Sequence, residues 1–186
     1  MKYISPFFRI FVVGIGLWGL SQPLVHAVRS ANGTVTFAEP PLLVAAKTPY
    51  LETSATDTTY YFTLDLPANA GEPLQKVTFL QTEGSQPIKF DLKNNRAFEG
   101  TQEHKGSKLT LKPPIQGDRS SQKITVIFDP PVAPGKTVTI ALRTFRNPLY
   151  DGIYLFGVTA FPAGEQATGQ FIGYGRLHFY SDGDSN

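Results

Sequence analysis

The sequence predicts an all-β protein, an immunoglobulin-like or related two-sheet β-sandwich preceded by a cleaved signal peptide. Apolar residues alternate with polar ones at a period of two, which is the pattern of half-buried strands. Pro and Gly, 15 and 17 of the 186 residues, recur between these runs and fix the backbone of turns. No long stretch has the spacing of an amphipathic helix. Roughly nine to eleven short strands are expected, which suits two packed sheets.

The first 27 residues have the pattern of a secretory signal peptide. Lys2 and Arg9 form a positive region, and residues 10–20 form an apolar segment. Val25-His26-Ala27 places small residues at the two positions that a signal peptidase reads. An uncleaved membrane anchor is the alternative, but it needs about 20 apolar residues. Polar Ser21-Gln22-Pro23 ends this segment too early for that.

We therefore expect a signal peptide at 1–27, a β-sandwich domain at 28–181 and a polar tail at 182–186. The chain has no Cys, so the stability of an exported domain must come from its core rather than from disulfides. Loss of Lys2 and Arg9 lowers the 17 basic residues to 15, which equals the 15 acidic residues. Balanced charge gives no signature of binding to nucleic acid or of membrane insertion after cleavage. The expected location is the periplasm or the cell exterior.

The first half of the domain is predicted to hold five strands. Tyr60, Phe62, Leu64 and Leu66 fall on one face of the clearest of them, which indicates a buried side. The second is short and is either an edge strand or an extended crossing. The five are expected at residues 34–37, 42–46, 60–66, 77–81 and 86–92.

The second half is predicted to hold six strands, at residues 97–100, 109–111, 124–128, 138–142, 153–161 and 170–180. Residues 153–161 are apolar on both faces, which favours an interior strand, and 170–180 return beside it as a hairpin. A corner rich in Pro and Gly is expected at 129–135. Tyr154, after Asp151-Gly152-Ile153, has the pattern of a tyrosine corner at the start of a penultimate strand.

No motif of a catalytic, metal or cofactor site stands out. Only His104 and His178 lie outside the first 27 residues, one in a charged turn and one in an alternating strand. The nucleophile motif Gly-x-Ser-x-Gly is absent, and Pro134-Gly135-Lys136-Thr137 lacks the upstream Gly and the following helix of a phosphate loop. We therefore expect a protein that is not an enzyme and has no metal and no cofactor.

The last strand carries the candidate ligand-binding residues Tyr174, Arg176, His178 and Tyr180, which share one face. Tyrosine offers a ring for stacking and a hydroxyl for hydrogen bonds, as sugar recognition requires. Cross-strand packing is the alternative role and the commoner one for such residues. The same alternation places Ile172 on this face and puts on the opposite face Phe171, Leu177 and Phe179.

Several short motifs resemble the cyanobacterial exported proteins grouped as domain of unknown function 2808. They are Phe62-Thr63-Leu64, Leu66-Pro67, Ala70-Gly71-Glu72-Pro73-Leu74, Phe98-Glu99-Gly100, Phe128-Asp129-Pro130-Pro131-Val132-Ala133-Pro134-Gly135, Arg146-Asn147-Pro148, Gly152-Ile153-Tyr154-Leu155-Phe156-Gly157-Val158 and Phe161-Pro162-Ala163-Gly164. The resemblance implies a secreted or periplasmic protein. It implies no activity and no functional residues, because the function of that family is not established.

The function expected from these observations is binding, by an exported, non-catalytic β-sandwich of the cell envelope. The partner would be an envelope protein or an extracellular polysaccharide. Two alternatives are a carbohydrate-binding module and a polysaccharide hydrolase that uses two carboxylates. A structural role in a larger assembly would require an exposed apolar patch or an unpaired edge strand near residues 42–46.

Overall fold

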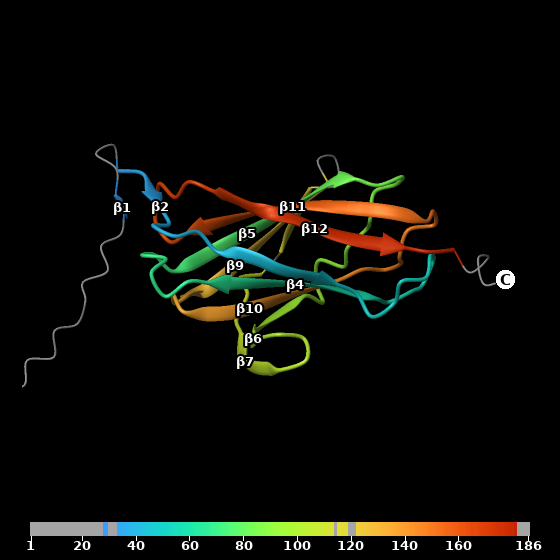
Figure 1. Cartoon of the computed structure of the whole chain (residues 1–186), viewed down its shortest axis with the longest axis horizontal. Coiled ribbons are helices and arrows are strands. Elements are labelled where there is room, and N and C mark those ends of the chain that lie inside the picture. Colours follow the sequence, from blue (N-terminus) through green and yellow to red (C-terminus); the bar gives the residue numbers. More distant parts are fainter. Residues whose placement is uncertain (1–27, 30–32, 114, 119–121, 182–186) are drawn as a thin grey trace, which may run out of the picture.

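Two five-stranded antiparallel sheets pack face to face in the computed structural model, which describes residues 28–29, 33–113, 115–118 and 122–181 (Figure 1). The described residues contain strands, turns and bends and no helix. The predicted all-β, two-sheet sandwich is therefore confirmed. The predicted signal peptide at 1–27 and polar tail at 182–186 lie outside the described residues.

The first sheet has the order β3-β4-β10-β6-β7, and the second has the order β12-β11-β5-β9-β8. The strands of the first sheet are β3 (Leu42–Lys47), β4 (Thr59–Leu66), β10 (Lys136–Arg143), β6 (Arg96–Gly100) and β7 (Lys105–Leu109). Those of the second are β12 (Gln170–Phe179), β11 (Gly152–Pro162), β5 (Leu74–Glu83), β9 (Lys123–Val132) and β8 (Gln116–Asp118). A separate short pair is formed by β1 (Val28–Arg29) and β2 (Val35–Thr36).

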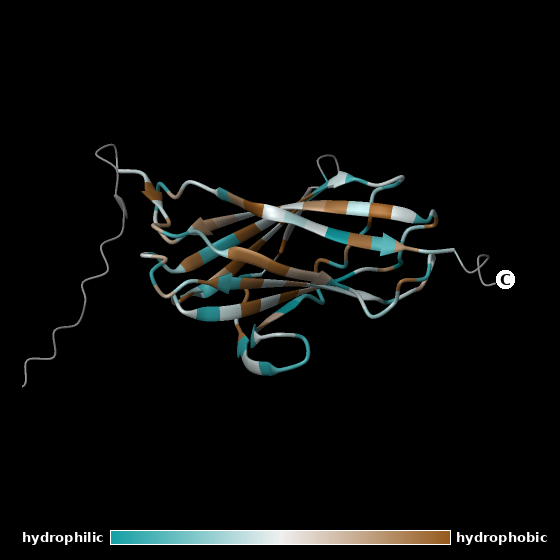
Figure 2. Ribbon diagram, in the orientation of Figure 1, coloured by the Kyte–Doolittle hydropathy of each residue, from teal (hydrophilic) through white to brown (hydrophobic). Residues whose placement is uncertain are grey.

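The core lies between the two sheets and follows the predicted alternation. On β4 the four residues Tyr60, Phe62, Leu64 and Leu66 are all fully buried. The ring of Phe62 contacts Phe79 of the opposite sheet at a centroid distance of 4.6 Å. Figure 2 shows the matching alternation of hydrophobic and hydrophilic colours along the strands. Because the domain has no disulfide, this apolar layer supplies most of its stability.

The tyrosine corner is present. Tyr154 is fully buried near the start of β11, and its hydroxyl donates a hydrogen bond to the carbonyl oxygen of Tyr150 at 3.0 Å. Burial raises the pKa of the Tyr154 hydroxyl, so it stays protonated and remains a donor. β11 lies between β12 and β5, as its apolar faces predicted.

The segment at 86–92 was predicted as a strand, and this prediction is wrong. It makes only an isolated bridge, between Phe90 and Thr144, as it crosses from the second sheet to the first. Ile88, Phe90 and Leu92 nevertheless pack against the core. The period of two therefore reported burial correctly but not hydrogen bonding to a neighbouring strand.

The predicted corner at 129–135 is wrong in its first half, because β9 continues through the prolines to Val132. Lys76 pairs with Ile127 and Leu74 pairs with Val132, so two steps along β5 correspond to five along β9. Pro lacks the N–H that a regular ladder needs, and a bulge of this kind tolerates it. The turn itself follows at 133–135.

A second bulge changes the predicted faces of β12. Val158 pairs with Gly173 and Thr159 with Phe171, so Ile172 is an extra residue on β12. Ile172 packs toward the core, and Phe171 faces solvent. Both positions are the reverse of the prediction, because one extra residue inverts the side of every residue beyond it.

Candidate functional site

The edge strands of the two sheets, β3 and β12, run side by side (Figure 1). A groove lies at this meeting of the two edges. Glycine allows this approach. A Cβ on Gly175 would stand 2.6 Å from the ring of Phe62 and 3.0 Å from the Cβ of Ala46. Beyond the strands, Tyr180 donates its backbone N–H to the Leu51 carbonyl at 2.9 Å, which closes that end of the groove.

The groove has a volume of about 300 Å³ and draws its walls from both sheets. Three of the four predicted ligand-binding residues line it, namely Arg176, His178 and Tyr180. The other lining residues are Ala46, Lys47, Thr48, Leu51, Gln102 and Leu177. The described residues that line it include no Asp or Glu, whereas Arg176 and Lys47 bring positive charge.

His178 and Tyr180 form a paired polar surface at one end of the groove. The Tyr180 hydroxyl lies 2.9 Å from Nδ1 of His178, and the two ring centroids are 4.2 Å apart. Tyr180 and Arg176 are exposed, and Arg176 makes no ion pair with any described residue. The groove therefore presents a guanidinium group, a hydroxyl, an imidazole and a ring face to whatever enters it.

The opposite wall comes from the turn at 101–104 between β6 and β7. Gly100 permits this turn, because it has φ of 88° and a Cβ there would lie 2.2 Å from the carbonyl oxygen of His104. Lys47 of β3 reaches the turn and pairs with Glu103 at 3.0 Å. His104 is exposed on the same turn, as its charged neighbours predicted.

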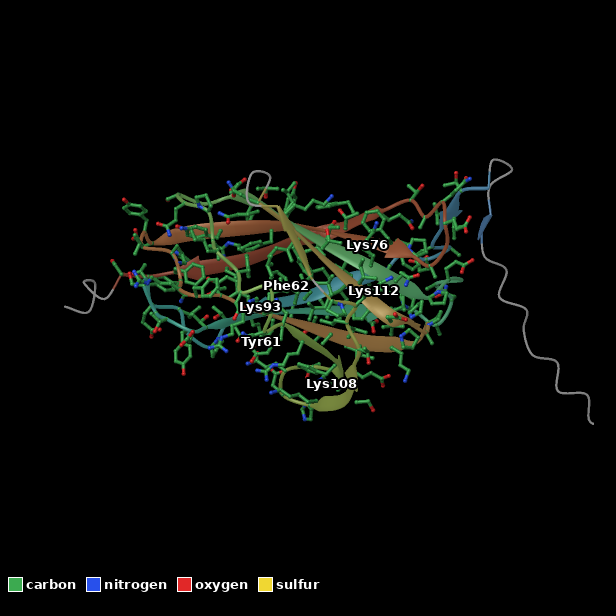
Figure 3. The ribbon with its side chains drawn as sticks, turned by 180° about the vertical axis from the view of Figure 1, so that it is seen from behind. Tyr61, Phe62, Lys76, Lys93, Lys108 and Lys112 are labelled. Atoms are coloured by element: carbon green, nitrogen blue, oxygen red, sulfur yellow. The ribbon has the colours of Figure 1, made fainter. Side chains whose placement is uncertain are left out.

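The turn covers the outer face of the first sheet. Tyr61 and Phe62 are adjacent on β4 but belong to different clusters: Phe62 lies in the main core, and Tyr61 packs with Phe98 and Ala141 on the other face (Figure 3). A small cavity of about 80 Å³ separates Tyr61 from residues 101–103 of the turn. Gln102 borders this cavity and the groove, so the position of the turn shapes both.

The ion pair should keep the turn closed well into the acidic range. The hydrogen bond from Lys47 is the main cause that lowers the pKa of Glu103 to about 2, from an ordinary 4.5. A lowered folded-state pKa means that the stabilising contribution is complete above about pH 4.5 and is lost as the pH falls toward 2. Both side chains are exposed, so salt should weaken the pair.

We expect a carboxyl NMR titration to find Glu103 still ionised below pH 4, where an ordinary glutamate is mostly protonated. Lys47→Met should raise the Glu103 midpoint toward its ordinary value. Lys136→Met, which removes the separate ion pair with Glu99, serves as the control and should leave Glu103 unchanged. A Glu103 midpoint that does not respond to Lys47→Met would contradict the assignment.

Tyr174, the fourth predicted residue, is exposed on the same strand but does not line the groove. It pairs instead with Phe171, at a ring-centroid distance of 4.9 Å. The structure thus brings three of the predicted residues into one site and gives the fourth a neighbour that the alternation had placed on the other face.

The sequence reasoning missed Lys47 and Gln102, which come from the first sheet. Neither has a pattern of its own that distinguishes it from an ordinary surface residue. One usable signal was present, because Gly173 and Gly175 on either side of Tyr174 mark a strand that another backbone approaches closely. In the described ranges, no three His, Asp or Glu residues gather as a metal site would require. The residues that the structure describes include no helix long and apolar enough to cross a membrane.

The solved structures similar to this chain include three bacterial domains. The collagen-binding domain of a Staphylococcus aureus adhesin is 9% identical, with 67% of this chain and 88% of that one covered and a TM-score of 0.38. An uncharacterized protein from Nocardia farcinica with an immunoglobulin-like fold is 11% identical, with 73% and 96% covered and a TM-score of 0.43. The C-terminal domain of the Streptococcus pyogenes antigen I/II-family protein AspA is 11% identical, with 73% and 46% covered and a TM-score of 0.40. This chain therefore spans about half of the AspA structure.

No curated protein matches the sequence. A family model described as "Protein of unknown function (DUF2808)" matches residues 34–179, from just before β2 to the end of β12. This match confirms the resemblance seen in the sequence motifs. The chain belongs to the DUF2808 family.

Proposed function

We propose that this protein is an exported, non-catalytic β-sandwich of the cell envelope that binds a surface polysaccharide in the groove between β3 and β12. The observation that carries the proposal is the meeting of Arg176, His178 and Tyr180 in one open groove with Lys47 and Gln102 of the other sheet. The signal-peptide pattern of the first 27 residues supports export.

The groove has the chemistry that sugar binding requires. Sugars present many hydroxyl groups around rings with apolar faces, so they are held by hydrogen-bonding side chains placed beside aromatic rings. Tyr180 supplies a ring and a hydroxyl, and Arg176, His178 and Gln102 supply polar groups around it. Hydrolysis would require two facing carboxylates. The lining residues that the structure describes include none, so the proposal assigns binding rather than hydrolysis to this groove.

A protein partner is the second candidate, and the edge strand β3 favours it. Leu42 and Val44 on β3 are each 55% exposed, and an edge strand can accept a further strand from another chain. This surface is adjacent to the groove, so one experiment has to separate the two candidates.

The purified protein would be mixed with intact envelope material, before and after enzymatic digestion of its polysaccharide, and the retained fraction measured. We expect digestion to abolish retention, and a double variant Arg176→Gln/Tyr180→Ala to lose it on undigested material. Arg146→Gln/Tyr150→Ala is the matched control, because both residues are exposed and lie outside the groove. Retention that survives digestion would overturn polysaccharide binding and favour a protein partner at β3.

A further inference from the structure

Phe171 and Tyr174 form an exposed aromatic platform on the outer face of the second sheet. They are 56% and 58% exposed, and their rings meet edge to face at 65°. Gly157 of β11 lies beneath them: a Cβ at that position would be 3.6 Å from each ring. Because Gly157 has no side chain, both rings extend over the neighbouring strand. The bulge at Ile172 is what turns Phe171 toward solvent to complete the platform.

The platform and the groove lie along the same strand. Tyr174, Arg176 and His178 of β12 and Tyr180, which directly follows it, stand at every second position and so share a face. Tyr180 lies six residue steps along the extended chain from Tyr174, which corresponds to about 20 Å. Arg176 stands between these two aromatic positions. A ligand that contacts both ends must be an extended chain rather than a single small molecule.

The charge of Arg176 indicates the chemistry of that chain. Leu155 of β11 pairs with Arg176 on one side and with Glu83 on the other, so an apolar residue separates the guanidinium from that carboxylate. Lys47 already holds Glu103, the acidic residue of the adjacent turn. A guanidinium group binds a carboxylate through two parallel hydrogen bonds, and a neutral sugar cannot make this pair.

We propose that the ligand is an acidic polysaccharide that lies extended along β12. One sugar ring stacks on the Phe171–Tyr174 platform, a sugar carboxylate pairs with Arg176, and a further unit contacts His178 and Tyr180 in the groove. This inference rests on the proposed function and adds to it the charge of the ligand and the length over which it is bound.

The test compares probes by titration calorimetry on the full exported protein at fixed salt. The acidic probes are oligogalacturonates and oligomannuronates of increasing length, and the neutral probes are malto-oligosaccharides of matched length. We expect the acidic probes to bind more tightly and to gain affinity with length until they span about 20 Å.

Two variants separate the contribution of Arg176 from that of the Phe171–Tyr174 platform. Arg176→Gln should weaken acidic probes about 10- to 100-fold and neutral probes of the same length much less, because only the acidic probes lose a charge-assisted pair. Tyr174→Ala should weaken long acidic probes about 3- to 10-fold without affecting short ones, because only long chains reach the platform. Arg146→Gln and Tyr150→Ala are the controls. The exposed fraction of Tyr150, 60%, is close to the 58% of Tyr174.

Each failure has a different meaning. Equal affinity for acidic and neutral probes would overturn the charge assignment, and the absence of any gain with length would overturn the extended path along β12. If neither acidic probe binds while envelope retention still depends on polysaccharide, the further inference fails and the proposed function stands. If retention does not depend on polysaccharide, the proposed function itself fails.

Discussion

Asn147→Ala is expected to lower the free energy of unfolding by about 3–5 kcal/mol. Asn147 is only 1% exposed, and its side chain joins four partners. Its Nδ2 donates to the carbonyl oxygens of Tyr50 at 3.0 Å and Glu52 at 2.8 Å, and its Oδ1 accepts from the hydroxyls of Tyr60 at 2.9 Å and Thr58 at 3.4 Å. Burial raises the pKa of Tyr60, so this hydroxyl stays a donor. Alanine would leave all four partners without the Asn147 side chain, and each buried group left unpaired costs about 1–3 kcal/mol.

Urea unfolding followed by circular dichroism would measure the loss. Asn94→Ala is the matched control, because Asn94 is exposed and bonds only locally to Asp91, and it should change stability by less than about 0.5 kcal/mol. A loss below about 1 kcal/mol for Asn147→Ala would show that water replaces its bonds readily. The variant should also loosen the Leu51 end of the groove, because Asn147 holds the carbonyls on either side of Leu51.

Phe62→Ala is expected to cost about 3–5 kcal/mol, through lost burial and through the cavity left behind. The ring is fully buried between Phe79 at 4.6 Å and Phe156 at 5.7 Å. It also lies directly beneath Gly175, where β12 approaches β3. The same substitution should therefore weaken ligand binding in the groove, although Phe62 does not line it.

Thermal and urea unfolding would give the stability change, and retention on envelope material would give the functional one. Phe145→Ala removes an equally large ring that is 57% exposed, and it should change neither quantity appreciably. Phe62→Leu should fall between wild type and Phe62→Ala, because it fills part of the cavity. A Phe62→Ala protein as stable as wild type would contradict the packing described for the core.

The fold was predictable where a residue pattern reports a local rule. The alternation from Tyr60 to Leu66 identified a buried strand face, and Asp151-Gly152-Ile153-Tyr154 identified the tyrosine corner. The two bulges were not predictable, because one extra residue at Ile172 leaves the composition of the strand unchanged. The segment at 86–92 alternates like a strand but has its apolar residues buried without a ladder. Alternation constrains burial more tightly than it constrains pairing.

Only the part of the candidate site that comes from the C-terminal strand could be predicted, because only that part follows a local residue pattern. Arg176 and His178 lie on β12 and Tyr180 directly follows it, so their common face follows from the period of two. Lys47 and Gln102 reach the same groove from strands and turns far away in the sequence, and only the packing of one sheet edge on the other brings them there. Pairing between distant segments carries no local signature in a single sequence.

The two edges of the first sheet differ in how readily another chain could add a strand to them. An uncovered sheet edge is a template on which other chains add strands and aggregate. At the corner where β3 meets β12, the backbone bonds of Leu51 and Thr53 to Tyr180 join the segments that follow β3 and β12, and they leave the β3 strand itself unpaired on its outer side. At the other edge of the first sheet, β7 carries Lys105 and Lys108, whose charges disfavour pairing with a strand of another chain. Figure 3 labels Lys108 on this strand. Charge therefore protects the β7 edge against strand addition, whereas the β3 edge stays open to a partner strand.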